Sequence, residues 1–275
     1  MNGRVLRTIA TKDLKEVRQN RAAWIPAIVV PMIFLVILPL VFILGPRLLN
    51  GSVAPLLSSS GPLGMMRDNI PALSAELAGL SDQQVWVVLF AGYLFAPFIL
   101  MMPLMFSTIV GAESFVGEKE RKTIEALVYT PASDGELFLG KVLASVVPAV
   151  GLTWVAFLIC GVVVNAAGWQ AMGRIWFPPA PWWPLMLWVA PAVATLGMAV
   201  TVLISSKVNT FMEAYQLSAS LVVLVLALVV GQATGILYLS VGMALVVGLV
   251  VWTADAVLIK LGIRSFSREA LLSRS

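Results

Sequence analysis

The chain has 275 residues, of which 60% are hydrophobic and 12% charged, and its mean hydropathy is +0.95. Soluble domains are about half apolar and about a quarter charged, so this composition predicts an all-α integral membrane protein with no separate soluble domain. The net charge of +4 does not indicate nucleic-acid binding, because the bases flank apolar runs and act there as orientation signals. The absence of histidine excludes histidine metal sites and histidine acid–base catalysis, and the single cysteine, Cys160, allows no disulfide within one chain.

Residues 1–23 are expected to form a basic amphipathic helix on the cytoplasmic membrane face. Between Arg4 and Arg21, lysines and arginines are interleaved with apolar residues at helical spacing, namely Leu6, Ile9, Ala10, Leu14 and Val17. This pattern is typical of a helix that lies flat on a membrane. A mitochondrial-type targeting peptide is the alternative, but Asp13 and Glu16 argue against it.

Six membrane spans are predicted within a permease domain at 24–259, and a polar tail follows at 260–275. The first span is too long for the apolar region of a signal peptide. The fifth is short and precedes a glycine-rich break at 231–235, which suggests a helix that turns inside the protein near one membrane surface. The predicted spans are 24–44, 85–110, 142–164, 184–204, 216–230 and 236–259.

Two connecting segments between the spans have distinctive compositions. Residues 45–84 are rich in Gly, Pro and Ser and predict a loop with one short helix at 74–80. Residues 165–183 combine tryptophans with prolines and predict an irregular loop that carries an aromatic belt at the membrane–water interface. Contact with a substrate is the alternative role for these aromatic side chains.

The distribution of positive charge predicts the orientation of the chain. With six spans, both termini lie on the same side. Fifteen of the 18 lysines and arginines lie in the two termini, the loop 111–141 and the turn at Lys207, whereas Arg47, Arg67 and Arg174 lie on the other side. Because cytoplasmic segments carry the excess of positive charge, both termini and the loop 111–141 are expected to be cytoplasmic, in a multi-pass protein of the plasma membrane.

The most highly charged segment of the chain lies between the second and third spans, at 113–141. Residues 119–129 predict a short helix with Ile124, Leu127 and Val128 on its apolar face. Pro131 ends this helix, because the residue before a proline avoids the helical region. Residues 133–136 form a capping-box pattern that begins the next helix. A short amphipathic helix, a break and a return into the membrane predict a docking element on the membrane face.

Two other features resemble sites of ligand binding or transport. Residues 135–142 nearly match the phosphate-binding pattern GxxxxGK[ST], but Val142 supplies no hydroxyl and the interior is bulky and helical, so no nucleotide site is predicted there. Asp255 is the only acid well inside a predicted span. Pairing with Lys260, Lys207 or Lys141 at a helix end is one interpretation, and a polar point on the translocation path is the other.

The charged segment also resembles a known family. The run 117–127 (GEKERKTIEAL), followed by Thr130-Pro131, Glu136 and Gly140-Lys141, is similar to the signature of type-2 ABC exporter permeases. The resemblance implies six spans, cytoplasmic termini and a coupling helix between spans two and three that docks on a separate ATPase. The resemblance implies that Glu118, Glu120, Arg121, Thr123 and Glu125 lie at or near this dock. Together with Ile124, Leu127 and Val128, the apolar face of the predicted helix, they are the expected ATPase-coupling residues, with Glu118, Glu120, Arg121 and Glu125 as a charged rim.

The expected function is therefore the membrane-spanning permease of an ATP-driven exporter, not itself an enzyme. It would form the translocation path with a second permease copy and pair with two cytoplasmic ATPase subunits. No cofactor or metal is expected on this chain, because ATP and Mg would bind the ATPase. The apolar composition suggests an amphipathic or lipid-like substrate. The alternative is a membrane scaffold that uses 113–137 to bind a partner complex, and an ion-coupled carrier is disfavoured by the shortage of intramembrane acids.

Overall fold

The computed structural model describes residues 3–19, 21–48, 53–59, 61–121 and 134–265, and within these ranges every regular element is helical. Six of its helical stretches are long and apolar enough to cross a membrane, which confirms the predicted all-α architecture at this level. They cover Ile28–Pro46, Asp82–Glu120, Gly135–Met172, Trp182–Ser205, Phe211–Ala233 and Val241–Gly262.

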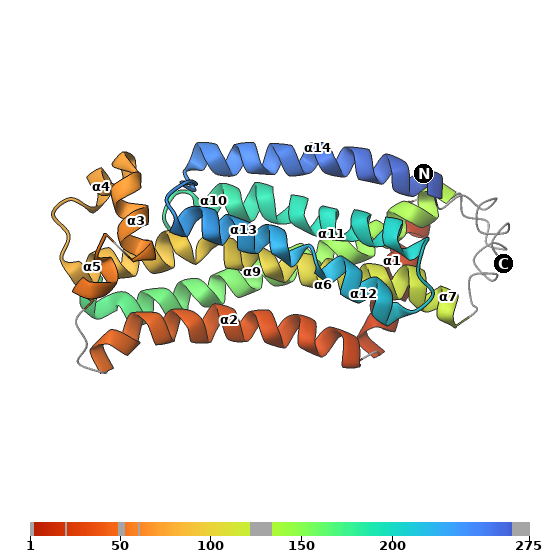
Figure 1. Ribbon diagram of the computed structural model, residues 1–275. Coiled ribbons are helices and arrows are strands. Elements are labelled where there is room, and N and C mark those ends of the chain that lie inside the picture. Colours follow the sequence, from red (N-terminus) through yellow and green to blue (C-terminus); the bar gives the residue numbers. More distant parts are fainter. Residues whose placement is uncertain (1–2, 20, 49–52, 60, 122–133, 266–275) are drawn as a thin grey trace.

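The six stretches lie lengthwise beside one another (Figure 1). The N-terminal helix α1 (Gly3–Gln19) and the end of α14 (Val241–Ser265) lie at the same end of this bundle. The second stretch is the most enclosed: 83% of its most apolar part is buried, against 17–28% for the first, third, fifth and sixth. Those four therefore present large apolar surfaces outward, as spans in contact with lipid do.

The second stretch is assembled from several short helices rather than one regular helix. It begins with α5 (Asp82–Val87) and passes through the π-helix η2 (Val88–Leu94) and the 3₁₀-helix η3 (Ala96–Leu100). It then continues as α6 (Met101–Ala112), the π-helix η4 (Glu113–Gly117) and α7 (Glu118–Glu120). The start at Asp82, three residues before the predicted one, is fixed by a capping box between Ser81 and Gln84.

The third stretch differs from the prediction, because α9 runs without interruption over Asp134–Met172. The segment 165–172, which was expected to be an irregular loop, is helical. The Asn165 side chain explains how the following chain is held: its amide donates to the Phe177 carbonyl at 2.8 Å, and its oxygen accepts from the Trp176 and Phe177 N–H groups. These bonds fold the loop back against α9 and satisfy its backbone inside an apolar region.

The aromatic belt predicted at 165–183 is only partly present. Trp169 and Trp183 are each 53% exposed, as expected of interface anchors. Phe177 and Trp182 are instead buried, and Trp182 Nε1 donates to the Gly92 carbonyl at 2.8 Å. These two rings pack against each other with centroids 4.7 Å apart, so they join the fourth stretch to the core and do not face the interface.

The segment 45–84 contains more helix than predicted. It holds η1 (Ala54–Leu57), α3 (Pro62–Asn69) and α4 (Pro71–Leu77), so the short helix expected at 74–80 begins and ends earlier. Glu76 on α4 accepts a hydrogen bond from Tyr93 at 2.6 Å. Asn69 donates to the Thr234 carbonyl at 3.0 Å. These contacts hold the segment 45–84 against the bundle at the end opposite α1 (Figure 1).

The fourth stretch consists of α10 (Trp182–Pro184), the π-helix η5 (Leu185–Val189) and α11 (Ala190–Ser205), and the fifth of α12 (Phe211–Ala219) and α13 (Val222–Ala233). The break begins later than predicted, because α13 continues through Ala233, and α14 begins only at Val241, five residues after the expected start. Gly235 has φ +74°, a conformation that favours glycine, and a side chain there would collide with Asn69. The chain is therefore turned by Gly235 before the last helix begins.

Candidate functional site

Helix α1 packs directly on the start of α9. A Cβ atom built on Gly140 of α9 would lie 2.9 Å from Ile9 Cβ of α1, closer than two carbon atoms tolerate. The glycine therefore permits the two helices to approach. This contact shows that α1 packs against other helices of the chain and does not only lie on the membrane surface, as the amphipathic pattern alone predicted.

Beside this contact, three helices meet in a buried ion-pair cluster. Glu118 of α7 is 3% exposed and Lys141 of α9 is fully buried. The Nζ atoms of Lys141 and Lys12 donate to the two carboxylate oxygens of Glu118 at 2.7 and 2.6 Å, and Lys141 also donates to the Ser114 carbonyl at 2.5 Å. Charge-assisted bonds of this length are strong when they are enclosed. Glu118 is therefore held by α1 and α9 at once.

Asp13 of α1 completes the cluster. It is 1% exposed, and its carboxylate lies 3.6 Å from Lys141 Nζ and 3.7 Å from Lys12 Nζ. Burial raises the pKa of Asp13 above its ordinary value, despite the opposing charges of the lysines. The sequence carried a signal for this position, because Asp13 lies on the apolar stripe of α1, spaced by three, four or seven residues from Ala10, Ile9 and Leu6.

The other two residues of α7 contact a fourth part of the chain. Lys119 Nζ donates to the Val208 carbonyl at 2.9 Å, in the turn after α11. Glu120 accepts a hydrogen bond from the Phe211 N–H at 3.0 Å, at the first residue of α12. A carboxylate at a helix N-terminus is favoured by the exposed N–H groups and the helix dipole. Arg121, which follows α7, pairs with the buried Glu113.

We call Glu118, Lys119 and Glu120, together with these partners, the α7 hub. It links α1, α9 and the α11–α12 turn to the end of the second stretch. Chemically, the hub is suited to holding helices in register and not to acid–base or nucleophilic chemistry. The chain continues from it directly into residues 122–133.

The predicted coupling residues divide into two groups. Thr123, Ile124, Glu125, Leu127 and Val128 lie outside the described residues, as does most of the helix predicted at 119–129. Glu120 and Arg121 are exposed at the start of that segment. Glu118 differs from its expected place on a surface rim, because Lys12 and Lys141 enclose it. Sequence reasoning did not identify Lys12 or Asp13 as part of this site.

Asp255 forms a salt bridge with none of its three expected partners, Lys260, Lys207 and Lys141, in the part of the chain that the structure describes. It is 1% exposed on α14, and neither carboxylate oxygen has a hydrogen-bond partner among the described residues. Lys141, one of its expected partners, instead binds Glu118. A Cβ on Gly248 would meet Trp188, and one on Gly262 would meet Val202, so α14 and α10–α11 run parallel in a common register. Asp255 lies midway along this contact, within the bundle and not at a helix end.

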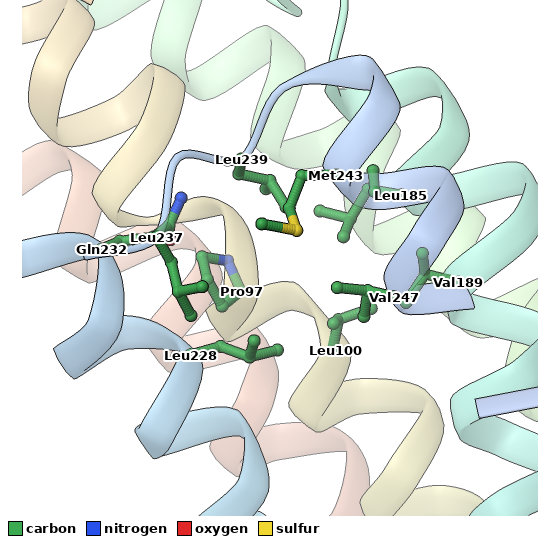
Figure 2. Close-up of a pocket in the computed structure, with 11 residues that line it drawn as sticks. Pro97, Leu100, Leu185, Val189, Leu228, Gln232, Leu237, Leu239, Met243 and Val247 are labelled. Atoms are coloured by element: carbon green, nitrogen blue, oxygen red, sulfur yellow. The ribbon is translucent and has the colours of Figure 1, made fainter. Parts of the chain in front are cut away.

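A small cavity at the other end of the bundle is lined by another unpartnered polar group. Its volume is about 20 Å³, and apolar side chains from five parts of the chain line it (Figure 2). Gln232 of α13 is the only polar side chain among the lining residues. It is 2% exposed, and neither atom of its amide group has a partner among the described residues.

The near-match to a phosphate-binding loop at 135–142 lies inside α9. Residues 135–142 form the first two turns of this helix, whereas the phosphate-binding pattern needs a bare loop between a strand and a helix.

Comparison with known proteins agrees with the architecture. The model of the ABC-2 family transporter protein matches residues 7–267, nearly the whole chain. No curated protein and no solved structure shows significant similarity to it. The matched region contains the six apolar stretches and the α7 hub. The chain therefore belongs to the ABC-2 family of transporter membrane proteins.

Proposed function

We propose that this chain is the permease subunit of an ATP-driven exporter, in which residues after the α7 hub bind a separate ATPase. Family membership supports a membrane component of an ABC-2 transporter. The finer proposal adds two ATPase subunits, which would carry ATP and Mg, and a second permease copy. The translocation path would lie between the two copies, and its substrate would be amphipathic or lipid-like.

The α7 hub is the observation that carries this proposal. Residues 122–133 are joined at one end to α7 and at the other to α9, and Glu118 binds Lys141 across those two ends. A push on this segment would therefore act on α7 and α9 together. Through Lys12 it would reach α1, and through Lys119 and Glu120 it would reach the α11–α12 turn. A rigid polar connection of this kind is suited to distributing motion among spans.

Within the proposed contact, the apolar residues would supply most of the affinity. Ile124, Leu127 and Val128 are the anchors, and Glu120, Arg121, Thr123 and Glu125 surround them. Charged rims affect association rate and register more than affinity. We propose that Glu118 acts indirectly: it fixes the position of α7 and does not touch the ATPase. The hub and both termini would face the cytoplasm, in accordance with the distribution of lysine and arginine.

The test is purification of the tagged permease from its native membranes, followed by measurement of the co-purified ATPase and of ATP-driven transport in vesicles. Leu127→Asp should abolish co-purification, because it places a charge in the apolar contact. Glu125→Lys should weaken it most at low salt, where charge repulsion is least screened. Leu249→Asn, on the outward face of α14, is the control for a polar substitution elsewhere. Unchanged ATPase recovery with Leu127→Asp would contradict the proposal, and an ATPase-free complex would favour a scaffold.

A further inference from the structure

An open groove runs along the half of α9 that lies farthest from the hub. Its volume is about 720 Å³. One wall is the α9 surface at Leu158 and Val162, and the other consists of the loop after α9 and the start of α10, including Ile175 and Trp183. The groove belongs neither to the hub nor to the small cavity of Figure 2.

The walls of the groove are apolar and outward-facing. Leu158, Val162 and Ile175 are 67%, 71% and 75% exposed. Because α9 is one of the six membrane-spanning stretches, this surface faces the hydrocarbon region of the bilayer. Two polar side chains, Asn165 and Gln170, also line the groove. The Asn165 amide is already occupied by the backbone of Gly161, Trp176 and Phe177, and Gln170 directly follows Trp169 in the sequence. The walls therefore suit an aliphatic chain.

One end of the groove has the chemistry of the headgroup region. Trp169 and Trp183 line it and are half-exposed, as tryptophans at a membrane–water interface are. Arg174 is not itself a lining residue, but it is exposed and directly precedes Ile175, which lines the groove. No acidic residue occurs in 165–183. A positive charge beside a groove-lining residue, in a segment that contains no acid, is complementary to a phosphate group.

We propose that this groove binds an anionic phospholipid of the leaflet farthest from the hub, with one acyl chain against α9 and the phosphate on Arg174. The occupant is a resident lipid of the membrane. The inference does not depend on ATPase coupling. It assigns Arg174 a role in lipid selectivity, and it assigns the tryptophans a role in positioning the lipid at the interface.

The test compares retention of phosphatidylglycerol and phosphatidylcholine on the purified protein by native mass spectrometry, after equilibration in mixed vesicles of the two lipids. Arg174→Gln should reduce phosphatidylglycerol retention about fivefold, the effect of one interfacial arginine, and leave phosphatidylcholine unchanged. Arg67→Gln is the matched control, because Arg67 lies at the same end but is paired with Asp68 at 2.7 Å. Equal losses for the two variants, or no loss for either, would overturn the proposal.

A second pair of variants tests the groove itself. Gly161→Leu should fill it, because a Cβ there has only ordinary contact with Phe177 at 3.8 Å, and retention of both lipids should fall. Val162→Trp fills the groove from its exposed edge without disturbing the core. Unchanged retention in both variants would overturn the acyl-chain site. In a Cys160→Ala background, efficient disulfide cross-linking of Val162→Cys between chains would identify a second permease copy as the occupant instead.

Discussion

The central carboxylate of the hub and the enclosed amide at the far end of the bundle differ in their partners. At the hub, Glu118 is enclosed but accepts hydrogen bonds from two lysines. Among the described residues, the neighbouring Asp13 is held only by ion-pair contacts of 3.6 and 3.7 Å to the same lysines. At the far end, the Gln232 amide is enclosed beside a cavity with apolar walls and has no partner among the described residues (Figure 2). A satisfied buried network fixes the geometry of the helices that supply it, whereas an unsatisfied group costs stability. The comparison therefore locates the rigid connection at the hub.

The largest loss of stability is expected when Lys141, the most buried residue of the hub, loses its charge. Lys141→Met should lower the free energy of unfolding by about 3–5 kcal/mol, because it leaves Glu118 and Asp13 enclosed with less compensating charge. The measurement is thermal unfolding of the purified protein in detergent. Lys207→Met removes an exposed lysine and serves as the control. Equal unfolding temperatures for the two variants would contradict the structural role of the hub.

Removing both charges should be less harmful than removing one. In Glu118→Met/Lys141→Met, apolar groups of similar size replace the pair, so about half of the single-variant loss should be recovered. Transport should not recover with it if the ion pair, and not only packing, links α7 to α9. A double variant less stable than Lys141→Met alone would show that the two residues do not act as a pair.

Asp255 is an enclosed carboxylate without a partner among the described residues, in the middle of the bundle. Asp255→Asn should raise the free energy of unfolding by about 1–2 kcal/mol. This gain is smaller than the roughly 2.5–3.5 kcal/mol for inserting an aspartate at a helix centre, because the new amide also lacks a partner. The same thermal measurement applies. A loss of stability would reveal a partner for the carboxylate, and a loss of transport in a stable variant would place Asp255 on the translocation path.

The smallest effect is expected at the far cavity. Gln232→Met keeps the length of the side chain and removes the unpartnered amide, so stability should rise by about 1 kcal/mol. A water molecule in the cavity would find this amide as its only side-chain partner, fewer than buried waters usually have. Val230→Met, on an exposed site of the same helix, is the control. A lower unfolding temperature for Gln232→Met alone would mean that the amide is satisfied.

The sequence was sufficient to predict the class of fold. Long apolar runs separated by charged or proline-rich segments specify membrane helices almost directly, so six stretches were found in the predicted order. Their ends were less predictable. The Asn165 side chain organises the loop after α9 through bonds to residues more than ten positions away, and Gly235 delays the start of α14. Such tertiary hydrogen bonds and close approaches leave little trace in local composition.

The candidate site was predictable only in its location. The density of charge at 113–141 indicated the right segment, but it could not show which of the charged side chains are enclosed. The partners of Glu118 are 23 and 106 residues away in sequence, and helix periodicity cannot identify them. Asp13 is the exception, since an acid on the apolar stripe of an amphipathic helix predicts a buried partner.

The central claim is that the segment following the α7 hub contacts an ATPase. It is tested most directly by replacing Leu127 with a photo-crosslinking amino acid, illuminating intact membranes and identifying the adducts by mass spectrometry. The same substitution at Val162, on the lipid-facing groove, serves as the reference. We expect a covalent ATPase adduct at position 127 and none at position 162. No ATPase adduct at 127, or equal adducts at both positions, would contradict it.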